Sequence, residues 1–410
     1  SNGFSHNAAE NKTYYQLKLD YQREFDRHNV SAMVLFNRSS RAYDNRVEYR
    51  YQGISGRATY AYDNKYLTEF NIGYNGSENF APGNRYGVFP AGSSAFEKRG
   101  IAVDVPEWDP TKCAQCNRCA MVCPHAVIRP VALTADELAA APANTKAVDL
   151  KVPKDSGLKY ALIISTLDCT GCASCANVCP TKSLTMKPIA SQLDSQPVFD
   201  ALCDIDPKAE VASDKTVVST QYLKPYLEFS GACAGCGETP YAKLATQLFG
   251  DKMYIANATG CSSIWGGSAP STPYTVDKHG NGPAWSNSLF EDNAEFGLGM
   301  FLAQAQIRSR LAEDAIALKE TSVGKEVQDY LDTFHSTRGN DAPAKALISA
   351  IENTEFDGEA KAAAEDFLKD KDYAAKKSQW IFGGDGWAYD IGFGGLDHVL
   401  AQNQDLNVLV

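Results

Sequence analysis

The stretch Cys-Ala-Gln-Cys-Asn-Arg-Cys-Ala-Met-Val-Cys-Pro at residues 113–124 decides how this chain folds, and Cys-Thr-Gly-Cys-Ala-Ser-Cys-Ala-Asn-Val-Cys-Pro repeats its pattern at residues 169–180. Both copies have the spacing Cys-x-x-Cys-x-x-Cys-x-x-x-Cys-Pro. With this spacing, three cysteines of a run bind one cubane iron–sulfur cluster, and the fourth binds the cluster of the other run. The two runs therefore predict a pair of [4Fe-4S] clusters with interleaved ligands.

The eight cysteines of these runs divide into two predicted ligand sets. One cluster takes Cys113, Cys116, Cys119 and Cys179, and the other takes Cys169, Cys172, Cys175 and Cys123. The alternative is a zinc knuckle or a disulfide frame, but zinc sites pair two Cys-x-x-Cys hooks and need neither a third cysteine at the same step nor a proline after the fourth. His125 follows the first run, and we expect it to pack or hydrogen-bond rather than bind metal. Cys203 stands alone and is expected to be a buried, unpaired thiol.

The composition bounds the class of protein. The 410 residues allow two or three domains, and the formal net charge of −11 argues against nucleic acid as a partner. The chain has twelve cysteines, and eight of them have metal-type spacing, which favours a reducing, cytoplasmic compartment over a secreted disulfide scaffold. The sequence has no run of about 18 apolar residues, so it predicts no transmembrane helix. Because the chain starts at Ser1 and ends in a strand-like run at residues 406–410, we expect a fragment.

Residues 1–93 differ from the rest: they contain no cysteine and are rich in Tyr, Asn, Arg and Gly. Apolar and polar residues alternate at 58–62 and 66–75, with a tight turn expected at 63–65, and residues 15–21 and 32–36 predict two more strands. Such strands occur in soluble antiparallel sheets and in outer-membrane barrels. The phrases at residues 51–60, 62–67 and 73–80 resemble those of TonB-dependent outer-membrane receptors, so this segment is similar to a small piece of such a barrel.

The C-terminal part carries three more cysteines, Cys233, Cys236 and Cys261. Their spacing alone leaves open a third cluster, a redox pair or inert thiols. Thr239 as N-cap and Pro240 at the first helical position predict a helix to residue 249, with a strand following at residues 252–257. Residues 274–285 are expected to form a loop and residues 286–319 a helix. Residues 312–377 are expected to form solvated helices.

Residues 380–410 have the pattern strand, glycine loop, helix and strand, typical of an α/β domain that binds phosphate at a helix N-terminus. Asp385, between Gly384 and Gly386, is a candidate Mg2+ ligand because Mg2+ takes one or two protein carboxylates together with phosphate oxygens. Residues 191–224 show no periodicity and are expected to be a linker.

Residues 94–410 closely resemble pyruvate:ferredoxin oxidoreductase, through the phrases at residues 96–108, 229–241, 258–266, 281–295 and 380–392. The resemblance implies a two-cluster ferredoxin-like domain at residues 94–190 and part of a thiamine diphosphate-binding domain at residues 225–410. It makes Cys233, Cys236 and Cys261 ligands of a third cluster, although the fourth cysteine of the family has no counterpart here. It further places Glu238, Cys261, Gly384, Gly386 and Trp387 around thiamine diphosphate and Asp385 on Mg2+, while the Asn that closes the cofactor motif falls beyond residue 410.

The expected fold is therefore mixed: an antiparallel β segment, a ferredoxin-like α+β domain and an incomplete α/β domain, in a chain that is chimeric or truncated. The implied activity is oxidative decarboxylation of a 2-oxo acid such as pyruvate with coenzyme A, with ferredoxin or flavodoxin as electron acceptor and a homodimer as the complete enzyme. The family's pyruvate-binding domain lies upstream, so no catalytic residue is predicted and the chain alone is not expected to turn over pyruvate. Two other hypotheses are an electron carrier without catalysis and an outer-membrane receptor fragment.

Overall fold

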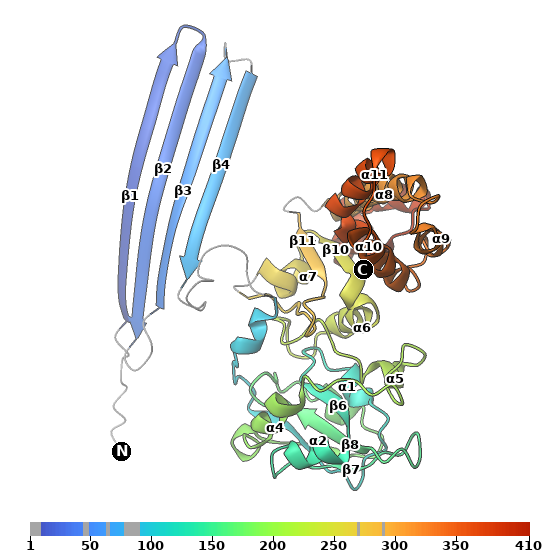
Figure 1. Cartoon of the computed structure of the whole chain (residues 1–410). Helices are drawn as coiled ribbons and strands as arrows, with labels where there is room; N and C mark the ends of the chain where they lie inside the picture. The colour runs from blue at the N-terminus through green and yellow to red at the C-terminus, as the bar shows by residue number, and fades with distance from the viewer. Residues whose placement is uncertain (1–9, 44–48, 63–65, 78–90, 269–270, 289–291) are drawn as a thin grey trace. The chain divides into compact units, whose positions relative to one another are not determined.

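The computed structural model describes residues 10–43, 49–62, 66–77, 91–268, 271–288 and 292–410 (Figure 1). The chain divides into two compact units, Ser1–Pro90 and Ala91–Val410. Among the described residues, none of the helices is both long enough and apolar enough to span a membrane.

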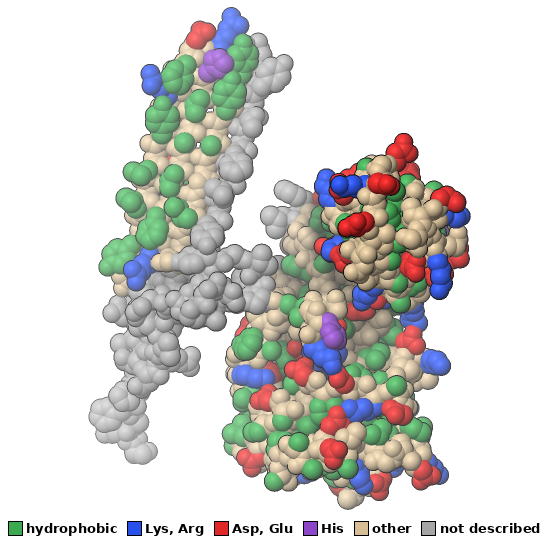
Figure 2. Space-filling view, viewed as in Figure 1, with side chains coloured by type: hydrophobic (Ala, Val, Ile, Leu, Met, Phe, Trp, Pro, Cys, Tyr) green, Lys and Arg blue, Asp and Glu red, His purple; other side chains and the backbone are tan. Residues whose placement is uncertain are grey.

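The first unit is a four-stranded antiparallel sheet whose strands follow one another in chain order. Its strands are β1 (Glu10–Phe25), β2 (His28–Tyr43), β3 (Tyr49–Tyr62) and β4 (Tyr66–Ser77). The four predicted strand segments lie within these longer strands, and the predicted turn at residues 63–65 lies outside the described residues. Leu17 is opposite Phe36, which is opposite Ile54, and all three side chains are exposed, so apolar side chains gather on the sheet surface (Figure 2).

The second unit begins with two copies of one strand–loop–helix–strand module, one for each cysteine run. The first copy contains β5 (Asp104–Trp108), α1 (Arg118–Met121) and β6 (Ile128–Leu133). The second contains β8 (Lys159–Ile164), α3 (Ser174–Asn177) and β9 (Leu184–Pro188). The outer strands β5 and β9 pair antiparallel, as do the inner strands β6 and β8, so the two copies face each other.

The segment between the two copies is folded onto them. It contains α2 (Ala135–Ala140), which Thr134 and Glu137 cap reciprocally, and β7 (Val148–Asp149), which pairs with β8. Gln115 of the first cysteine run donates to the Asp149 carbonyl oxygen at 2.8 Å. This insert therefore holds the first cysteine loop in place.

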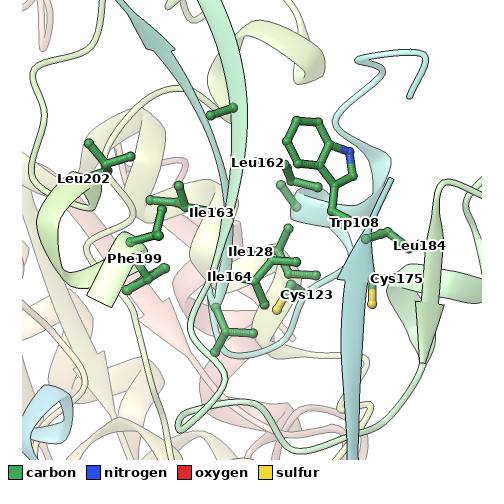
Figure 3. Close-up of a cluster of buried hydrophobic side chains, with 14 of the residues drawn as sticks. Trp108, Cys123, Ile128, Leu162, Ile163, Ile164, Cys175, Leu184, Phe199 and Leu202 are labelled. Carbon is green, nitrogen blue, oxygen red and sulfur yellow. The ribbon is translucent and has the colours of Figure 1, made fainter. Parts of the chain in front are cut away.

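The core of the two modules extends into residues 191–224, which the sequence predicted to be a linker. Figure 3 shows Phe199 and Leu202 beside Ile163, with Trp108, Ile128 and Leu184 in the same cluster, and all six side chains are buried. Phe199 and Leu202 belong to α4 (Ser195–Leu202), and α5 (Val217–Thr220) follows. The segment is thus part of the folded unit, because a helix of eight residues buries apolar side chains without giving a long periodic pattern.

The C-terminal sheet is entirely parallel, with the strand order β11-β10-β12-β13. The strands are β10 (Met253–Asn257), β11 (Ala284–Asn287), β12 (Ser378–Phe382) and β13 (Asn407–Leu409). Its two faces lie in separate apolar clusters, one with residues of α6 (Thr239–Phe249) and the other with residues of α8 (Asn293–Ala317) and α12 (Phe393–Ala401). This is a doubly wound α/β arrangement.

Three details of this part differ from the sequence expectations. Residues 284–287 form a strand across the boundary between the expected loop and the expected helix, and α8 begins only at Asn293, because pairing with β10 is a contact that local composition does not encode. Helix α6 begins one residue earlier than expected: Glu238 is the N-cap and Thr239 is already helical. Helices α8, α9 (Gly324–Asp332), α10 (Asp341–Glu352) and α11 (Gly358–Lys369) are not merely solvated, since they enclose a core of their own around Tyr330, Leu347 and Phe367.

Candidate iron–sulfur and cofactor sites

The two cysteine runs adopt the same backbone conformation. The second and fourth residues after the first cysteine of each run have left-handed φ angles, at Gln115 and Asn117 in one run and at Gly171 and Ala173 in the other. The N–H groups of Gln115 and Gly171 both donate to the sulfur of the cysteine two residues before, at 3.4 Å. N–H donors aimed at cysteine sulfur are one of the features that set cluster potentials.

The first predicted ligand set is brought together around Cys119. Burial and the repulsion from neighbouring thiolates raise the pKa of Cys119 to about 12, and those neighbours are Cys113, Cys116 and Cys179. Cys179 comes from the other run, 60 residues further along the chain. The structure therefore places the fourth cysteine of the second run beside the first three of the first run.

The second predicted set surrounds a cavity. Its walls include the four cysteines of that set, which are Cys123, Cys169, Cys172 and Cys175. Burial and repulsion from neighbouring thiolates raise the pKa of Cys175; among these thiolates Cys123 contributes most, followed by Cys119 of the first set and then by Cys169 and Cys172. Burial is also the main cause that raises the pKa of Cys169 to about 12. Cys123 and Cys175 lie at the edge of the apolar core (Figure 3).

Cys179 differs from the other buried cysteines. Burial raises its pKa, but hydrogen bonds from the Ser183 N–H group (3.2 Å) and hydroxyl (3.7 Å) and from Thr181 outweigh burial and leave the pKa at about 7. Cys179 therefore becomes a thiolate, the form that binds iron, more readily than Cys119, Cys169 or Cys175.

The donor set fits two iron–sulfur clusters. Thiolates crowded in an apolar site repel one another, and bound iron supplies the positive charge that keeps coordinating thiols deprotonated. Among the described residues, no group of three or more Cys, His, Asp or Glu side chains is arranged to hold a single metal ion. A cubane distributes four thiolates over four iron atoms, whereas one zinc ion draws its sulfurs to about 2.3 Å.

His125 has the structural role that the sequence predicts. Its side chain is buried, and Nδ1 lies 3.1 Å from the Ser230 carbonyl oxygen. Burial lowers its pKa, so the neutral imidazole is favoured. The backbone of His125 also accepts a hydrogen bond from the Phe229 N–H group at 2.9 Å. His125 thus links the first cysteine run to the segment that leads to Cys233. Cys203 is half-buried rather than fully buried.

The loop with Cys233 and Cys236 packs on the second cysteine run. A Cβ placed on Gly235 would lie 3.6 Å from the Cβ of Cys172, so the two loops are in van der Waals contact. Cys233 is exposed and Cys236 half-buried. Cys261 is exposed at the start of α7 (Cys261–Ser263), and Trp265 on the following turn donates to Glu238 Oε2 at 3.0 Å. This hydrogen bond links the segment that follows Cys236 to the segment that follows Cys261. The described residues show no contact among the sulfur atoms of Cys233, Cys236 and Cys261.

The candidate cofactor residues meet at the carboxyl edge of the parallel sheet. Strands β10 and β12 are neighbours, and the Asn257 amide at the end of β10 donates to the Phe382 carbonyl oxygen at the end of β12, at 3.0 Å. The loops that begin there contain Cys261 and Asp385. The chain order of the strands reverses between β10 and β12, and ligands of open α/β sheets bind at such a point.

The residues at this edge fit a magnesium-bound diphosphate. Asp385 is exposed, and a Cβ on Gly384 or Gly386 would meet nothing within 4 Å, so the loop is open. Buried Asn287 Oδ1 and Asn293 Oδ1 have no hydrogen-bond partner among the described residues. Trp387, in contrast, is buried against Gly383 and Gly392, so its ring lies in the core rather than in the open loop.

Sequence reasoning missed two basic residues that are buried in the second unit. Lys243 of α6 is buried, and its Nζ donates to the backbone of the first cysteine run. Burial lowers the pKa of Lys243 to about 8. Arg129, five residues after Pro124, forms a buried ion pair with Glu228. A single basic residue in a helix or strand is normally expected to be exposed to solvent, so the sequence did not indicate that either side chain is buried.

Comparison with known proteins agrees with the geometry of the two runs. Two models described as "4Fe-4S binding domain" match, one at residues 105–128 and the other at residues 162–185. The fold and the site thus define an iron–sulfur protein with two 4Fe-4S domains.

The homologues of this chain are pyruvate oxidoreductases. It is 50% identical over 327 residues to the pyruvate-flavodoxin oxidoreductase of Klebsiella pneumoniae and 50% identical over 334 residues to the pyruvate:ferredoxin oxidoreductase of Moorella thermoacetica. It is 44% identical over 331 residues to the mitochondrial pyruvate dehydrogenase (NADP(+)) of Euglena gracilis. Each match covers 79% of this chain; the chain spans 28% of the first two relatives and 18% of the third.

Proposed function

We propose that this chain provides the electron-transfer part of a thiamine-dependent 2-oxo acid oxidoreductase. The observation that carries the proposal is the interleaving of the two cysteine runs, with Cys179 beside Cys119 and Cys123 beside Cys175. Two clusters bound by interleaved ligands lie close together, which suits stepwise transfer of single electrons. The 4Fe-4S domain matches and the pyruvate oxidoreductase homologues support the same function.

The third cluster would use Cys233, Cys236 and Cys261. The packing of Gly235 on Cys172 supports this assignment, because it brings the Cys233 loop to a ligand of the second cluster. Electrons would pass from this loop to the two ferredoxin-type clusters and on to ferredoxin or flavodoxin. The whole reaction would convert a 2-oxo acid such as pyruvate and coenzyme A into acyl-CoA and CO2, in a cytoplasmic homodimer.

Thiamine diphosphate, when bound, stabilises the carbanion that forms as CO2 leaves. Asp385 at the end of β12 would hold its Mg2+, and the open backbone at Gly384 and Gly386 would lie along the diphosphate. Glu238 accepts a hydrogen bond from Trp265 and would border the cofactor from the neighbouring loop, together with Cys261. Trp387 would support this loop from the core side.

Metal and cofactor analysis of the full chain, purified without oxygen, tests the proposal. We expect about twelve iron atoms and as much sulfide per chain, together with bound thiamine diphosphate. About eight iron atoms without thiamine diphosphate would instead identify a two-cluster electron carrier. Zinc in place of iron, or an absence of acid-labile sulfide, would refute both functions.

A further inference from the structure

Lys243 connects the α/β part of the second unit to the loop of the first cysteine run. Its side chain, on α6, is 2% exposed. Nζ donates to three backbone carbonyl oxygens, those of Ala120, Met121 (3.1 Å) and Cys123 (3.2 Å). These carbonyls lie in the last turn of α1 and just after it, and the Ala120 oxygen also accepts a hydrogen bond from the Cys123 N–H group at 3.3 Å. The ammonium therefore sits at the negative end of that short helix, next to a predicted cluster ligand.

In the described part of the chain, no carboxylate forms an ion pair with this buried cation. Among the described residues, the ionisable groups that act on Lys243 are Cys123, Arg129 and Cys119, and Arg129 has the same charge as Lys243. A buried ammonium without a counter-charge lowers the stability of the fold, because it has lost its hydration without gaining an opposite charge. Three carbonyl oxygens satisfy its hydrogen bonds but carry no net charge. The site therefore needs an anion that the side chains themselves do not provide.

The two clusters are the anions in the right place. Cys119 belongs to the first ligand set and Cys123 to the second, so Lys243 acts electrostatically on one ligand of each cluster. A cubane with four thiolate ligands carries net negative charge, and one more electron increases that charge without breaking or forming a bond. A fixed positive charge in a dry site attracts the reduced cluster more strongly than the oxidised one.

We propose that Lys243 is the shared counter-charge of the two clusters and that it raises their reduction potentials. The inference rests on the proposed function, since it requires both clusters to be bound. Lys243 is a positioning and tuning residue: it touches the backbone that presents the ligands, not the iron. Lys243 lies on α6, the helix that follows the Cys233 loop. The reduction potentials of the two clusters therefore depend on the packing of α6 against the first cysteine run.

The test is the Lys243→Met variant of the full chain, which removes the charge and keeps an unbranched side chain of similar length. We expect the equilibrium constant for one-electron reduction of at least one cluster to fall tenfold or more. This corresponds to a reduction potential that is more negative by about 59 mV. Anaerobic redox titration followed by electron paramagnetic resonance measures it. The matched control is Lys112→Met, which removes the same charge beside Cys113 from a side chain that is 61% exposed. Solvent screens that charge, so its shift should be much smaller.

The outcomes separate this inference from the proposed function. If the unchanged chain binds no iron, the proposed function fails first. If Lys243→Met keeps its iron and its potentials equal those of the unchanged chain or of the Lys112→Met control, the counter-charge role is refuted. If Lys243→Met loses iron, the charge model requires Lys243→Arg to keep it and Lys243→Gln, which retains hydrogen-bond donors, to lose it. Retention by both variants, or loss by both, refutes the proposal.

Discussion

The ion pair between Arg129 and Glu228 joins the cysteine-run modules to the segment that leads to Cys233, and its loss should destabilise the chain strongly. The two side chains are only 8% and 10% exposed. Arg129 Nε also donates to the Ala126 carbonyl oxygen at 2.9 Å, and its guanidinium lies 5.0 Å from the centre of the Phe199 ring and 5.4 Å from that of Phe229. Substitution of Glu228 leaves the guanidinium buried without its carboxylate.

We expect Glu228→Gln to cost about 3 kcal/mol, the lower end of the range for breaking a buried pair, because glutamine still accepts a hydrogen bond. If the pair is already broken in the unfolding transition state, this cost raises the unfolding rate about 100-fold. The assay is the rate at which guanidinium bleaches the visible absorption of the clusters. A rate is the appropriate quantity since cluster loss makes unfolding irreversible.

A matched control separates burial from pairing. Lys278 and Asp206 form an ion pair at 2.6 Å, with side chains 62% and 63% exposed, so Asp206→Asn should change the bleaching rate very little. The double variant Arg129→Met with Glu228→Leu should regain most of the lost stability, because it removes the stranded charge. A bleaching rate for Glu228→Gln within about threefold of the Asp206→Asn rate would refute the reasoning.

Three further predictions follow from single contacts. Cys123→Ser should lower the iron content by about four atoms per chain and Cys203→Ser should leave it unchanged; equal iron in both variants would contradict the ligand assignment. Thr134→Ala should cost about 1 kcal/mol by removing the capping box of α2, whereas Thr134→Ser keeps the hydroxyl and should bleach at the original rate. Burial raises the pKa of Glu137, but hydrogen bonds from Lys208 and the Thr134 backbone outweigh it and hold the pKa below 4.5. This carboxylate therefore stabilises the fold above pH 4.5 and loses its effect as the pH falls through the lower pKa of the folded state. The clusters of Glu137→Gln should bleach faster than those of the unchanged chain at pH 7 and at the same rate in acid. A difference in rate that persists in acid would contradict this assignment.

Local patterns predicted local structure well in the α/β part. The expected helix to residue 249 and the expected strand at residues 252–257 correspond to α6 and β10 within a residue or two. Proline at a helix start and alternating apolar residues act within a few positions, so they can be read from the chain. Strand β11 escaped prediction because its residues lie where the Gly- and Pro-rich stretch meets the expected helix, and they become a strand only by pairing with β10, about 30 residues earlier.

The same distinction holds for α4 and for the charged residues of the core. Phe199 and Leu202 are apolar residues in a segment rich in Pro, Asp and Lys, and they became core residues only by packing against β8. Lys243 is one lysine on an amphipathic helix, where solvent exposure is the ordinary expectation. Its burial depends on α6 meeting the end of α1, a contact between residues about 120 positions apart.

The sequence by itself determined which atoms can bind the clusters, because the ligands of a cubane are presented by short loops and the spacing of cysteines along such a loop is a local property. It also predicted that the fourth cysteine of each run serves the other cluster. Only the tertiary structure decided what surrounds them: the Cys233 loop against Cys172, the loops of Cys261 and Asp385 at one sheet edge, and the buried ammonium of Lys243. These neighbours come from distant parts of the chain and meet only when α6 and the parallel sheet pack, which no local spacing can specify.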